Sequence, residues 1–451
     1  MFLFLSRYPN SHKNVNMLNK KQHEAVEFVA NGHNLVITGR AGTGKTLTVK
    51  SIVEKCHLID KQCAVTATTG IACSLYPHSV NAMTIHRWSG IGDGRYGPPE
   101  IKVIVSNNVK FKSVLDRILQ TDVLVIDEFS MLSKRTLESL NAVCSLKNPE
   151  LYFGGIQIVL VGDLVQLPPV PCARYNEEGA YCFESEIFNR AFPHQINLVE
   201  VYRQTDIRLV KAIEEVSVGT VSDETLDFMN ALTRPLDDSE SDSFPIRLFA
   251  TNDLVDDYNR DQILDFPGVL YKFLSADTGE KKYLHEIMAC HMLWIKIGIP
   301  VILIKNLSDQ LVNGLRGVVH DIQDDGNILV EFPNIKETVY IKKERFEVFD
   351  PRRNAVVAVR EQYPLKAAFA LTIHKSQGMT LDRVHVDCRE IFKPGQLGVA
   401  IGRASTLSGL RVINFSRRVC MKQPEKVMQF WAKGDSVKIE EDKTCCNRCI
   451  W

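Results

Sequence analysis

A phosphate-binding loop is the clearest chemical signal in the sequence. Residues 39–46 read Gly-Arg-Ala-Gly-Thr-Gly-Lys-Thr, which matches the pattern G-x-x-x-x-G-K-[ST]. In such a loop, glycines let successive backbone N–H groups turn inward around phosphate oxygens, and the helix that follows adds the positive end of its dipole. We therefore expect Lys45 to reach the β- and γ-phosphates of a nucleotide and Thr46 to ligate Mg²⁺. The other residues of the predicted nucleotide-binding loop are Gly39, Gly42, Thr43 and Gly44.

Two carboxylates form the second chemical signal. The apolar run at residues 123–126 ends directly in Asp127 and Glu128. Asp127 is expected to hold Mg²⁺, directly or through water, and Glu128 is expected to activate the water that attacks the γ-phosphate. Acidic residues after buried strands are also common as helix caps, so the pair gains its meaning from the phosphate loop that precedes it.

A glutamine follows a third apolar run. Residues 157–161 lead into the sequence Gly-Asp-Leu-Val-Gln-Leu-Pro-Pro at residues 162–169. At the carboxyl end of an adjacent strand, Gln166 could sense the γ-phosphate and couple it to a bound polymer. From the residues alone, it is equally expected that Gln166 is a turn residue held in place by the two prolines.

Short apolar runs alternate with helical patterns from about residue 17 to residue 200. The strand candidates are residues 35–38, 64–67, 123–126 and 157–161. This alternation predicts an α/β fold in which helices cover a parallel sheet. A second α/β pattern begins at residues 247–251 and continues from about residue 367 to residue 416.

Residues 291–364 have a different pattern. Four short strand-like runs are separated there by Asn-Gly, Asp-Gly and Pro-Asn turns. This spacing predicts a small β-barrel that is inserted into the second α/β domain. Residues 233–245 are acidic, rich in serine and bounded by proline, so we expect a surface loop.

The overall composition excludes several classes of protein. The chain has 451 residues, of which 45% are hydrophobic and 24% are charged, close to an average soluble globular protein. Collagens, coiled coils and wholly disordered chains differ from this composition, and the apolar runs are too short to cross a bilayer. Lys plus Arg total 54 and Asp plus Glu total 54. This balance argues against a protein that coats nucleic acid electrostatically, and it is compatible with a local basic groove.

Cysteine usage indicates a reducing compartment. Twelve cysteines are scattered through the chain, mostly inside apolar segments, which predicts buried thiols rather than a disulfide framework. Cys445, Cys446 and Cys449 lie close together in the sequence. A zinc site needs four ligands and no nearby histidine completes one, so we do not expect zinc.

Taken in order, the motifs resemble those of superfamily 1B helicases, close to the Pif group of 5′→3′ DNA helicases, in a compact core form. The resemblance covers about residues 17–416 and includes about ten motifs in the family's order. The family usually has Ser-Arg where this chain has Gly402 and Arg403, and the arginine is kept. The matching segments are residues 18–22, 39–46, 65–72, 84–86, 127–131, 153–157, 162–169, 202–204, 251–252, 311–317, 372–378 and 399–403.

The resemblance implies two RecA-like P-loop domains, each a parallel sheet with helices on both faces. A small wedge insert in the first domain could split the duplex, and an SH3-like β-barrel would interrupt the second. The implied segments are a leader (1–16), the first domain (17–200) with its wedge (about 88–110), the second domain (201–290 and 365–435), the barrel (291–364) and a tail (436–451).

The resemblance also assigns roles to single residues. Gln22 would read the adenine, and Gln377 and Gly378 would also contact the nucleotide. Arg203 and Arg403 would reach the γ-phosphate, where cations delivered across a closing cleft stabilise the transferring phosphoryl group. The implied DNA contacts are Thr68, Thr69, Thr84, His86, Asn252, Asn313, Thr372, His374 and Lys375. Such groups bind phosphates without reading bases. Taken singly, each of these threonines and histidines is more often a helix cap or a core residue. For Asn313, in the predicted barrel, a role in fixing a turn is equally expected.

The implied function is an ATP- and Mg²⁺-dependent 5′→3′ DNA helicase that hydrolyses ATP to ADP and phosphate, translocates on single strands and unwinds duplex DNA. The expected partners are single-stranded and forked DNA, with a monomeric motor and no membrane association. The family's settings are DNA repair, recombination, replication and telomere maintenance, in the nucleus or alternatively the mitochondrion. The residues leave open a superfamily 1 RNA helicase, a DNA translocase that does not unwind, and an ATP-switched nucleic-acid-binding module.

Overall fold

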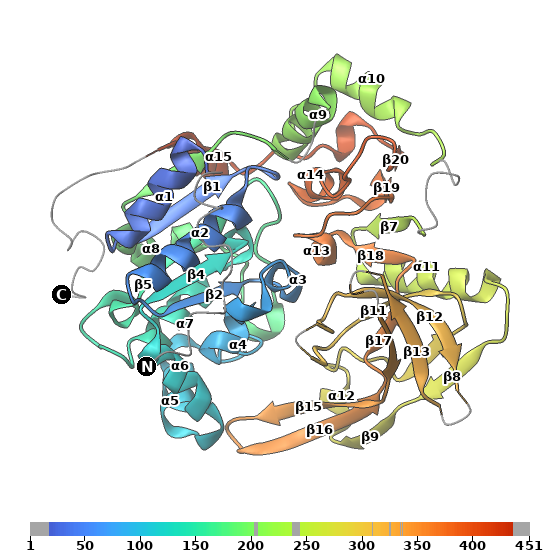
Figure 1. Cartoon of the computed structure of the whole chain (residues 1–451), viewed down its shortest axis with the longest axis horizontal. Helices are drawn as coiled ribbons and strands as arrows, with labels where there is room; N and C mark the ends of the chain where they lie inside the picture. Colours follow the sequence, from blue (N-terminus) through green and yellow to red (C-terminus); the bar gives the residue numbers. More distant parts are fainter. Residues whose placement is uncertain are drawn as a thin grey trace, which may run out of the picture. The chain divides into compact units, whose positions relative to one another are not determined.

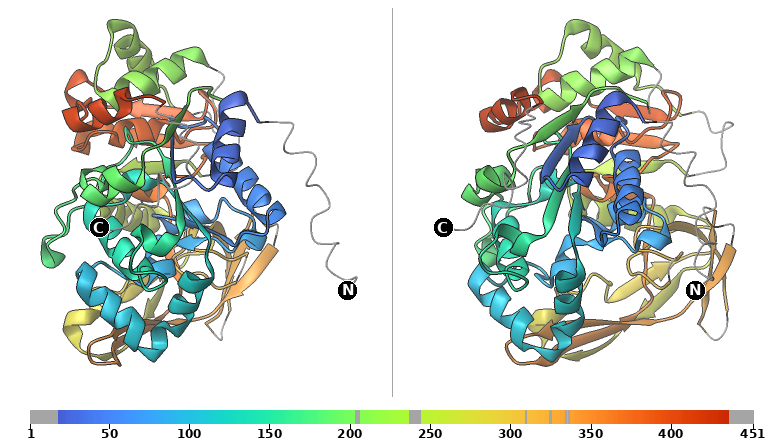
Figure 2. Two further views of the ribbon diagram at one scale, coloured as in Figure 1. Left: turned by 90° about the vertical axis from the view of Figure 1, so that its left-hand side faces the viewer. Right: turned by 60° about the vertical axis from the view of Figure 1, so that its left-hand side comes forward.

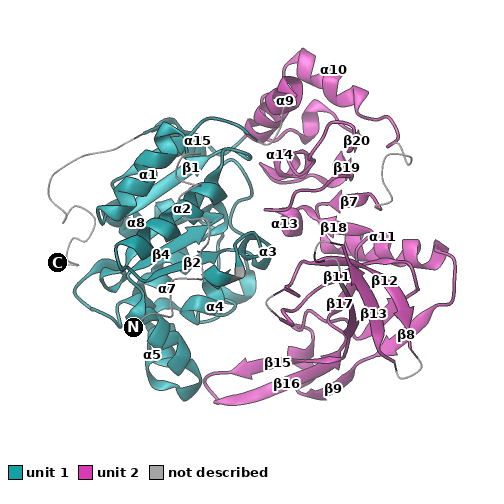
Figure 3. Ribbon diagram, viewed as in Figure 1, with its two compact units in different colours: residues 1–205, 423–451 teal, residues 206–422 magenta. Residues whose placement is uncertain are grey.

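The structure, a computed structural model, describes residues 18–202, 206–236, 244–308, 310–323, 326–333, 335 and 337–435. The chain divides into two compact units, which Figure 3 draws in different colours. Unit 1 comprises residues 1–205 and 423–451, and unit 2 comprises residues 206–422. The predicted leader, Arg203, most of the predicted acidic loop and the cysteine-rich tail lie outside the described residues.

Unit 1 is built on a six-stranded parallel sheet in the order β3-β2-β4-β5-β1-β6. Figure 1 labels β1, β2, β4 and β5 of this sheet. Its strands are β1 (Leu35–Gly39), β2 (Cys63–Ala67), β3 (Met83–Thr84), β4 (Val123–Asp127), β5 (Gln157–Gly162) and β6 (Gln195–Leu198). Every residue of β1, β4 and β5 is buried. These strands are rich in Val, Ile and Leu because helices cover both faces of the sheet. The four strands expected from the sequence lie within β1, β2, β4 and β5.

Each face of this sheet has its own apolar core. Val123 and Val125 belong to a cluster with α1 and α2, whereas Leu124 and Ile126 belong to a cluster with α5 to α8. Alternate residues of one strand therefore point to opposite faces. The helices of unit 1 are α1 (Lys20–Ala30), α2 (Lys45–Leu58), α3 (Gly70–Cys73), α4 (Ile85–Ser89), α5 (Pro98–Asn107), α6 (Lys112–Gln120), α7 (Lys134–Cys144), α8 (Glu186–Ala191) and α15 (Glu425–Ala432). Figure 2 shows the same ribbon from two further sides.

The predicted wedge insert at residues 88–110 contributes to the second of these cores. Trp88 and Ile101 are each 1% exposed, and α5 packs against α7. Proline occupies the start of α5, where its missing N–H leaves no intrahelical bond unmade. The insert therefore contains a helix that packs against α7 and shares its apolar core, and the role of the insert as a wedge stays a prediction.

Unit 1 also includes a helix from much later in the chain. The sequence predicts that residues 365–435 belong to the second domain, whereas the structure places residues from 423 onward in unit 1. α15 buries Val427 and Phe430 in the same cluster as α7 and α8. The Phe430 ring stacks on Phe183 with 4.8 Å between ring centroids. Packing between residues that are distant in the sequence accounts for the difference.

Unit 2 contains a four-stranded parallel sheet in the order β18-β7-β19-β20. Its strands are β7 (Ile246–Phe249), β18 (Ala370–Thr372), β19 (Val384–Asp387) and β20 (Leu410–Ile413). The helices of this part are α9 (Ile207–Val218), α10 (Asp223–Ala231), α11 (Asn252–Asp265), α13 (Ile373–Ser376) and α14 (Gln396–Ile401). Among the residues that the structure describes, no helix is both long enough and apolar enough to span a bilayer.

Antiparallel strands occupy the chain between α11 and β18. They form a sheet in the order β14-β13-β12-β11-β17, a sheet in the order β15-β16-β9 and the pair β10-β8. They begin before the predicted boundary at residue 291, because β8 pairs with β10 and β9 pairs with β16. An SH3-like barrel stays a prediction. The elements are β8 (Tyr271–Leu274), β9 (Ala276–Gly279), α12 (Lys281–Leu284), β10 (Met292–Ile295), β11 (Pro300–Leu303), β12 (Arg316–Ile322), β13 (Ile328–Phe332), β14 (Glu337–Ile341), β15 (Glu344–Asp350), β16 (Ala355–Gln362) and β17 (Leu365–Ala367).

A largely buried ion pair joins β9 to β16. Arg360 donates from Nε and one terminal nitrogen to the two carboxylate oxygens of Asp277, at 2.8 and 2.7 Å. The two side chains are only 10% and 17% exposed. A third nitrogen of Arg360 donates to the carbonyl of Ala289 at 2.8 Å. The hydrogen bond from Arg360 lowers the pKa of Asp277 to about 2.

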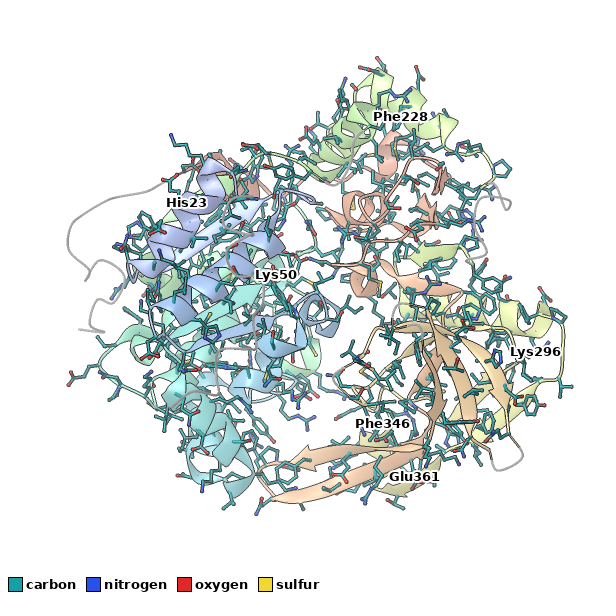
Figure 4. All side chains as sticks on the ribbon, viewed as in Figure 1. His23, Lys50, Phe228, Lys296, Phe346 and Glu361 are labelled. Atoms are coloured by element: carbon teal, nitrogen blue, oxygen red, sulfur yellow. The ribbon has the colours of Figure 1, made fainter. Side chains whose placement is uncertain are left out.

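Replacing Asp277 with asparagine should destabilise unit 2 near neutral pH by about 2 kcal/mol, because the guanidinium of Arg360 loses its charged acceptor. An aspartate whose pKa falls on folding stabilises the fold above its unfolded pKa of about 3.9, and this contribution disappears as the pH falls toward the folded value. Urea unfolding should therefore show the difference from the parent chain shrinking below about pH 4. Glu361→Gln, an exposed neighbour on β16 (Figure 4), is the matched control. A difference that does not change with pH would contradict this assignment.

Candidate nucleotide and nucleic-acid site

The carboxyl ends of the six parallel strands meet at one edge of the unit 1 sheet. Apart from Gln22 on α1, the described site residues that we predict in this unit lie at those ends or shortly after them. The strand order places β3 beside β2, then β4, β5 and β1. Predicted DNA contacts follow β3 and β2, and predicted nucleotide contacts follow β4, β5 and β1. The topology therefore places the two sets of residues next to each other along one edge, where ligands of open parallel sheets bind.

The phosphate loop connects β1 to α2 through two glycines in the left-handed conformation. Gly42 and Gly44 have φ values of 84° and 82°, which glycine adopts without steric cost. At Gly39, an added Cβ would lie 2.6 Å from the nearest side-chain atom, so a side chain does not fit. The Nζ of Lys45 donates to the carbonyls of Gly39 at 2.7 Å and Arg40 at 2.9 Å. These bonds hold the ammonium group against the backbone of the loop.

Two further segments fix the phosphate loop. Gln22 is 1% exposed, and its Nε2 donates to the carbonyl of Thr43 at 3.2 Å. Its Oε1 accepts from the backbone N–H of Asn19, which closes a capping box at the start of α1. The backbone N–H of Tyr202 donates to the carbonyl of Gly42 at 2.8 Å. Gln22 therefore supports the loop directly, and its predicted contact with adenine stays a prediction.

A buried carboxylate ends β4. Asp127 is 4% exposed, and its two oxygens accept from the phenol of Tyr76 at 2.5 Å and from the N–H of Glu128 at 2.8 Å. Burial, followed by the charge of Glu128, raises the pKa of Asp127 to about 6. A carboxylate whose ionised form is disfavoured in this way is stabilised by a nearby cation.

The turn after β4 is fixed by the residue that follows β2. Glu128 is 8% exposed and has a φ of 54°, a conformation that non-glycine residues rarely adopt. The hydroxyl of Thr68 donates to the carbonyl of Glu128 at 3.0 Å, and the N–H of Thr68 donates to the carbonyl of Asp127 at 3.2 Å. Thr68, a predicted DNA contact, thus holds the backbone of the predicted general base.

A third carboxylate follows β5. Asp163 is 4% exposed, and burial raises its pKa while the charge of Lys45 acts in the opposite direction. Gln166 donates from Nε2 to Asp163 at 3.1 Å. Within the described part of the chain, the Oε1 of Gln166 is buried and has no hydrogen-bond partner. An amide oxygen only accepts, so this atom suits a water or an ammonium group as its partner, and the role of Gln166 as a γ-phosphate sensor stays a prediction.

These residues fit a nucleotide and a divalent cation. Mg²⁺ takes oxygen ligands and usually combines one or two carboxylates with phosphate oxygens. The hydroxyl of Thr46, at the second residue of the 14-residue helix α2, and the carboxylate of Asp127 supply ligands of this kind. The close approach at Gly39 and the N-terminus of α2 suit phosphate groups.

Two predicted DNA contacts of unit 1 cap short helices. Thr69 accepts from the N–H of Ala72 at the start of α3, and Thr84 accepts from the N–H of Arg87 at the start of α4. A capping hydroxyl keeps its own O–H, which can still donate to a phosphate. Burial lowers the pKa of His86, so its imidazole is neutral near pH 7.

Unit 2 repeats this arrangement at the carboxyl end of β18. Thr372 accepts from the N–H of Lys375 at 3.2 Å and caps α13. Burial, followed by the charge of Lys393, lowers the pKa of His374 to about 4, and burial also lowers the pKa of Lys375. β7 lies beside β18, and exposed Asn252 begins the helix that follows β7. The structure therefore brings these four predicted contacts to one edge of the second sheet.

The remaining predictions fall into different surroundings. Gln377 is fully buried after α13, and Gly378 has a φ of 88°. The N–H of Asn313 donates to the side-chain oxygen of Asn306 at 2.7 Å. This bond uses the backbone of Asn313 and the side chain of Asn306, so the choice between a turn role and a DNA contact for the Asn313 side chain stays a prediction.

Arg403 is buried inside unit 2. It is 2% exposed, and its guanidinium donates to the carbonyl of Val399 at 3.0 Å and to that of Met379 at 3.3 Å. These contacts hold the end of α14 to the chain after α13. The contact of Arg403 with a nucleotide stays a prediction, as does that of Arg203, which lies outside the described residues.

Sequence reasoning missed two residues of the nucleotide edge. Tyr76 occupies an irregular segment and no local pattern connects it to Asp127. Asp163 follows an apolar strand in the same way as Asp127, so the signal that identified one carboxylate could have identified the other.

Two parallel α/β units, one of them with a phosphate loop and carboxylates at its carboxyl edge, define a P-loop NTPase with two RecA-like domains. Residues 17–227 match the family described as PIF1-like helicase, and residues 283–322 match the family described as DNA helicase Pif1, 2B domain. The chain belongs to the PIF1-like helicase family.

Individual relatives agree with this assignment. The chain is 34% identical over 411 residues to the ATP-dependent DNA helicase PIF1 of Danio rerio, covering 89% of this chain and 62% of that protein. The crystal structure of Pif1 helicase from Candida albicans has a TM-score of 0.83 and 33% identity, covering 92% of this chain and 99% of that one. Pif1 helicase from Bacteroides in complex with ADP-AlF3 and ssDNA has a TM-score of 0.76 and 25% identity, covering 92% and 97%. The chain thus spans less than two thirds of the length of its curated relative from Danio rerio.

Proposed function

We propose that this chain is an ATP- and Mg²⁺-dependent DNA helicase that moves 5′→3′ on single-stranded DNA and unwinds duplex DNA. The observation that carries the proposal is the shared edge of the unit 1 sheet. There the hydrogen bonds of Thr68 to Asp127 and Glu128 join a predicted DNA contact to the predicted catalytic carboxylates. A motor needs such a connection, because each hydrolysis event must change its grip on the strand. Family membership, and the Bacteroides relative with ssDNA and ADP-AlF3, support DNA and ATP as ligands.

The residues of the phosphate loop bind the nucleotide. The loop N–H groups and the ammonium of Lys45 compensate the phosphate charge, while Gln22 contacts the adenine. Thr46 and Asp127 would hold Mg²⁺, which would neutralise phosphate charge when bound. Gln377 and Gly378 contribute further nucleotide contacts from the second domain.

Hydrolysis transfers the γ-phosphoryl group to water. Glu128 accepts a proton as the water oxygen bonds to the γ-phosphorus, and the bond to the β–γ bridging oxygen breaks to give ADP and phosphate. Gln166, which Asp163 orients, senses the γ-phosphate. Arg203 and Arg403 supply further positive charge to the γ-phosphate when the nucleotide cleft closes.

The DNA contacts are short donors that bind the phosphodiester backbone. In unit 1 these are the hydroxyls of Thr68, Thr69 and Thr84 and the imidazole of His86. In unit 2 they are Asn252, Asn313, Thr372, His374 and Lys375. Because phosphate contacts do not depend on base identity, the grip suits a strand of any sequence. We expect the motor to act as a monomer on single-stranded and forked DNA, in the nucleus or alternatively the mitochondrion.

The proposal predicts that single-stranded DNA stimulates ATP hydrolysis and that a 5′ tail is required for unwinding. The measurement is steady-state ATPase rate with and without single-stranded DNA or RNA, together with unwinding of duplexes that carry either a 5′ or a 3′ tail. Stimulation by DNA with unwinding from the 5′ tail alone is expected. A preference for RNA tails would indicate an RNA helicase, and stimulation without unwinding would indicate a translocase. An ATPase that no nucleic acid stimulates would reject the motor.

A further inference from the structure

The chain crosses from unit 2 back to unit 1 between two neighbouring anchors. On the unit 2 side, a Cβ added to Gly219 at the end of α9 would lie 2.2 Å from the carbonyl oxygen of Met421, so the two backbones are in close contact. On the unit 1 side, Gln423 is 8% exposed and donates from Nε2 to the carbonyl of Val165 at 2.8 Å. Unit 2 ends at Lys422, so a single residue separates the two anchors.

Residues Gln423–Asp435, which we call the return segment, are fixed to unit 1 at several points. Phe430 is 6% exposed and lies in the apolar core that includes residues of α5 to α8. Lys426 pairs with Glu184 at 2.8 Å. Asp435 accepts from the ammonium of Lys21 at 2.5 Å. The return segment is therefore anchored at its beginning, its middle and its end.

An aromatic ring of the return segment contacts the phosphate loop. The guanidinium carbon of Arg40 lies 5.3 Å from the ring centroid of Trp431, within the range of a cation–π interaction. The carbonyl of the same arginine accepts from Lys45 Nζ and from Thr43 Oγ1, each at 2.9 Å. Trp431 therefore fixes the residue whose backbone holds the phosphate-binding lysine.

The first anchor of the return segment contacts the loop after β5. Val165, whose carbonyl accepts from Gln423, directly precedes Gln166, the predicted γ-phosphate sensor. Burial raises the pKa of Asp163 in the same loop, and the charges of Lys45 and Arg40 act against this rise. Arg40 therefore lies near both the return segment and the loop after β5. It connects the contact made by Trp431 with the contact made by Gln423.

We propose that the return segment positions the ATP site, with Trp431 and Gln423 as positioning residues that act through Arg40 and Val165. The inference rests on the ATPase function proposed above and adds residues to it that lie outside the helicase motifs. Trp431 acts on the loop that binds the phosphates and not on the attacking water. Its loss should therefore weaken ATP binding more than it slows turnover of bound ATP.

The test compares two replacements of Trp431 in the full chain. Trp431→Leu keeps an apolar side chain but removes the ring, and it should raise the KM for ATP about fivefold, a change within the range of one cation–π contact. The kcat should stay within about twofold of the parent value. Trp431→Phe should restore most of the affinity, because a phenyl ring also binds a guanidinium. Titration with a fluorescent ATP analogue in the absence of DNA should show the same order of affinities.

Two further variants separate positioning from packing. Phe430→Leu disturbs the same helix at a core position that contacts other phenylalanines, so it should lower the melting temperature and leave the KM unchanged at temperatures where the protein is folded. Arg40→Gln removes the group through which Trp431 acts. Adding Trp431→Leu to Arg40→Gln should therefore raise the KM no further than Arg40→Gln alone.

The outcomes distinguish this inference from the proposed function. If the parent chain does not hydrolyse ATP, the proposed function fails and the inference fails with it. If the parent chain is active but Trp431→Leu leaves the KM within about twofold, or Phe430→Leu raises it equally, only the positioning role of the return segment is rejected.

Discussion

Replacing Lys45 with alanine should lower the rate of ATP hydrolysis by about 100- to 1000-fold, the usual effect of removing a positioned charge-stabilising group. The ammonium is held at 2.7 and 2.9 Å from two carbonyls of the phosphate loop, so it is in place before the nucleotide binds. Lys45 is partly exposed and contributes no apolar contact to either core. The melting temperature should therefore change little while steady-state turnover with saturating single-stranded DNA is lost.

Lys50→Ala is the matched control for this experiment. Lys50 lies on the same helix, α2, beyond the first turn that borders the phosphate loop (Figure 4). The control variant should keep the ATPase rate and the melting temperature of the parent chain. If Lys45→Ala retained turnover within a few-fold of the parent chain, the phosphate site would have been misplaced.

Glu128→Gln should separate ATP binding from ATP hydrolysis. The amide has the shape of the carboxylate but cannot accept a proton from water, so turnover should fall by about 100- to 10,000-fold. The hydrogen bond from Thr68 goes to the backbone carbonyl of Glu128, and the substitution leaves it intact. Binding of a fluorescent ATP analogue should therefore stay within about threefold of the parent value, since the phosphate loop is unchanged.

Glu24→Gln, at an exposed position on α1, controls for the loss of a negative charge in the same unit. Full turnover in Glu128→Gln would remove the general base from the mechanism and would favour the ATP-switched binding module. Parallel loss of binding and turnover would instead make Glu128 a structural carboxylate.

The sequence predicts the parallel sheets and the phosphate loop because the relevant signals are local. β1, β4 and β5 are short apolar runs, and the loop is a fixed pattern between a strand and a helix. The carboxyl-edge position of Asp127 follows from the same local order. Family resemblance then places all the DNA-contact candidates except Asn313 at or just after the ends of β2, β3, β7 and β18. The residues alone do not separate a helix cap from a phosphate donor. Thr69, Thr84 and Thr372 are caps in the structure, and capping leaves an O–H for a ligand.

Contacts between distant parts of the chain could not be predicted from local sequence signals. The phenol of Tyr76 reaches Asp127 across 51 positions of sequence, and no periodicity records that contact. The docking of α15 on unit 1 depends on rings contributed by Phe183 and Phe188, and an isolated eight-residue apolar helix does not reveal its partner. The sequence does not predict β8 and β9 as part of the antiparallel region, because neither strand has a buried residue and β9 reads Ala-Asp-Thr-Gly, which is not an apolar run. Short strands gain their stability from the partner strand rather than from their own sequence.

The position of α15 has a consequence for the order in which the protein folds during synthesis. Val427 and Phe430 complete the core of unit 1, yet they are made after the whole of unit 2. At about 5–20 residues per second, a ribosome takes roughly 10–40 seconds to synthesise the chain between the two parts of unit 1. During that interval Phe183 and Phe188 lack their partner ring, although N-terminal domains usually fold first. A chain that terminated within unit 2 would carry every residue of the phosphate loop on a unit with an unfinished core. Such a chain would be a substrate for chaperones and proteases rather than an active enzyme.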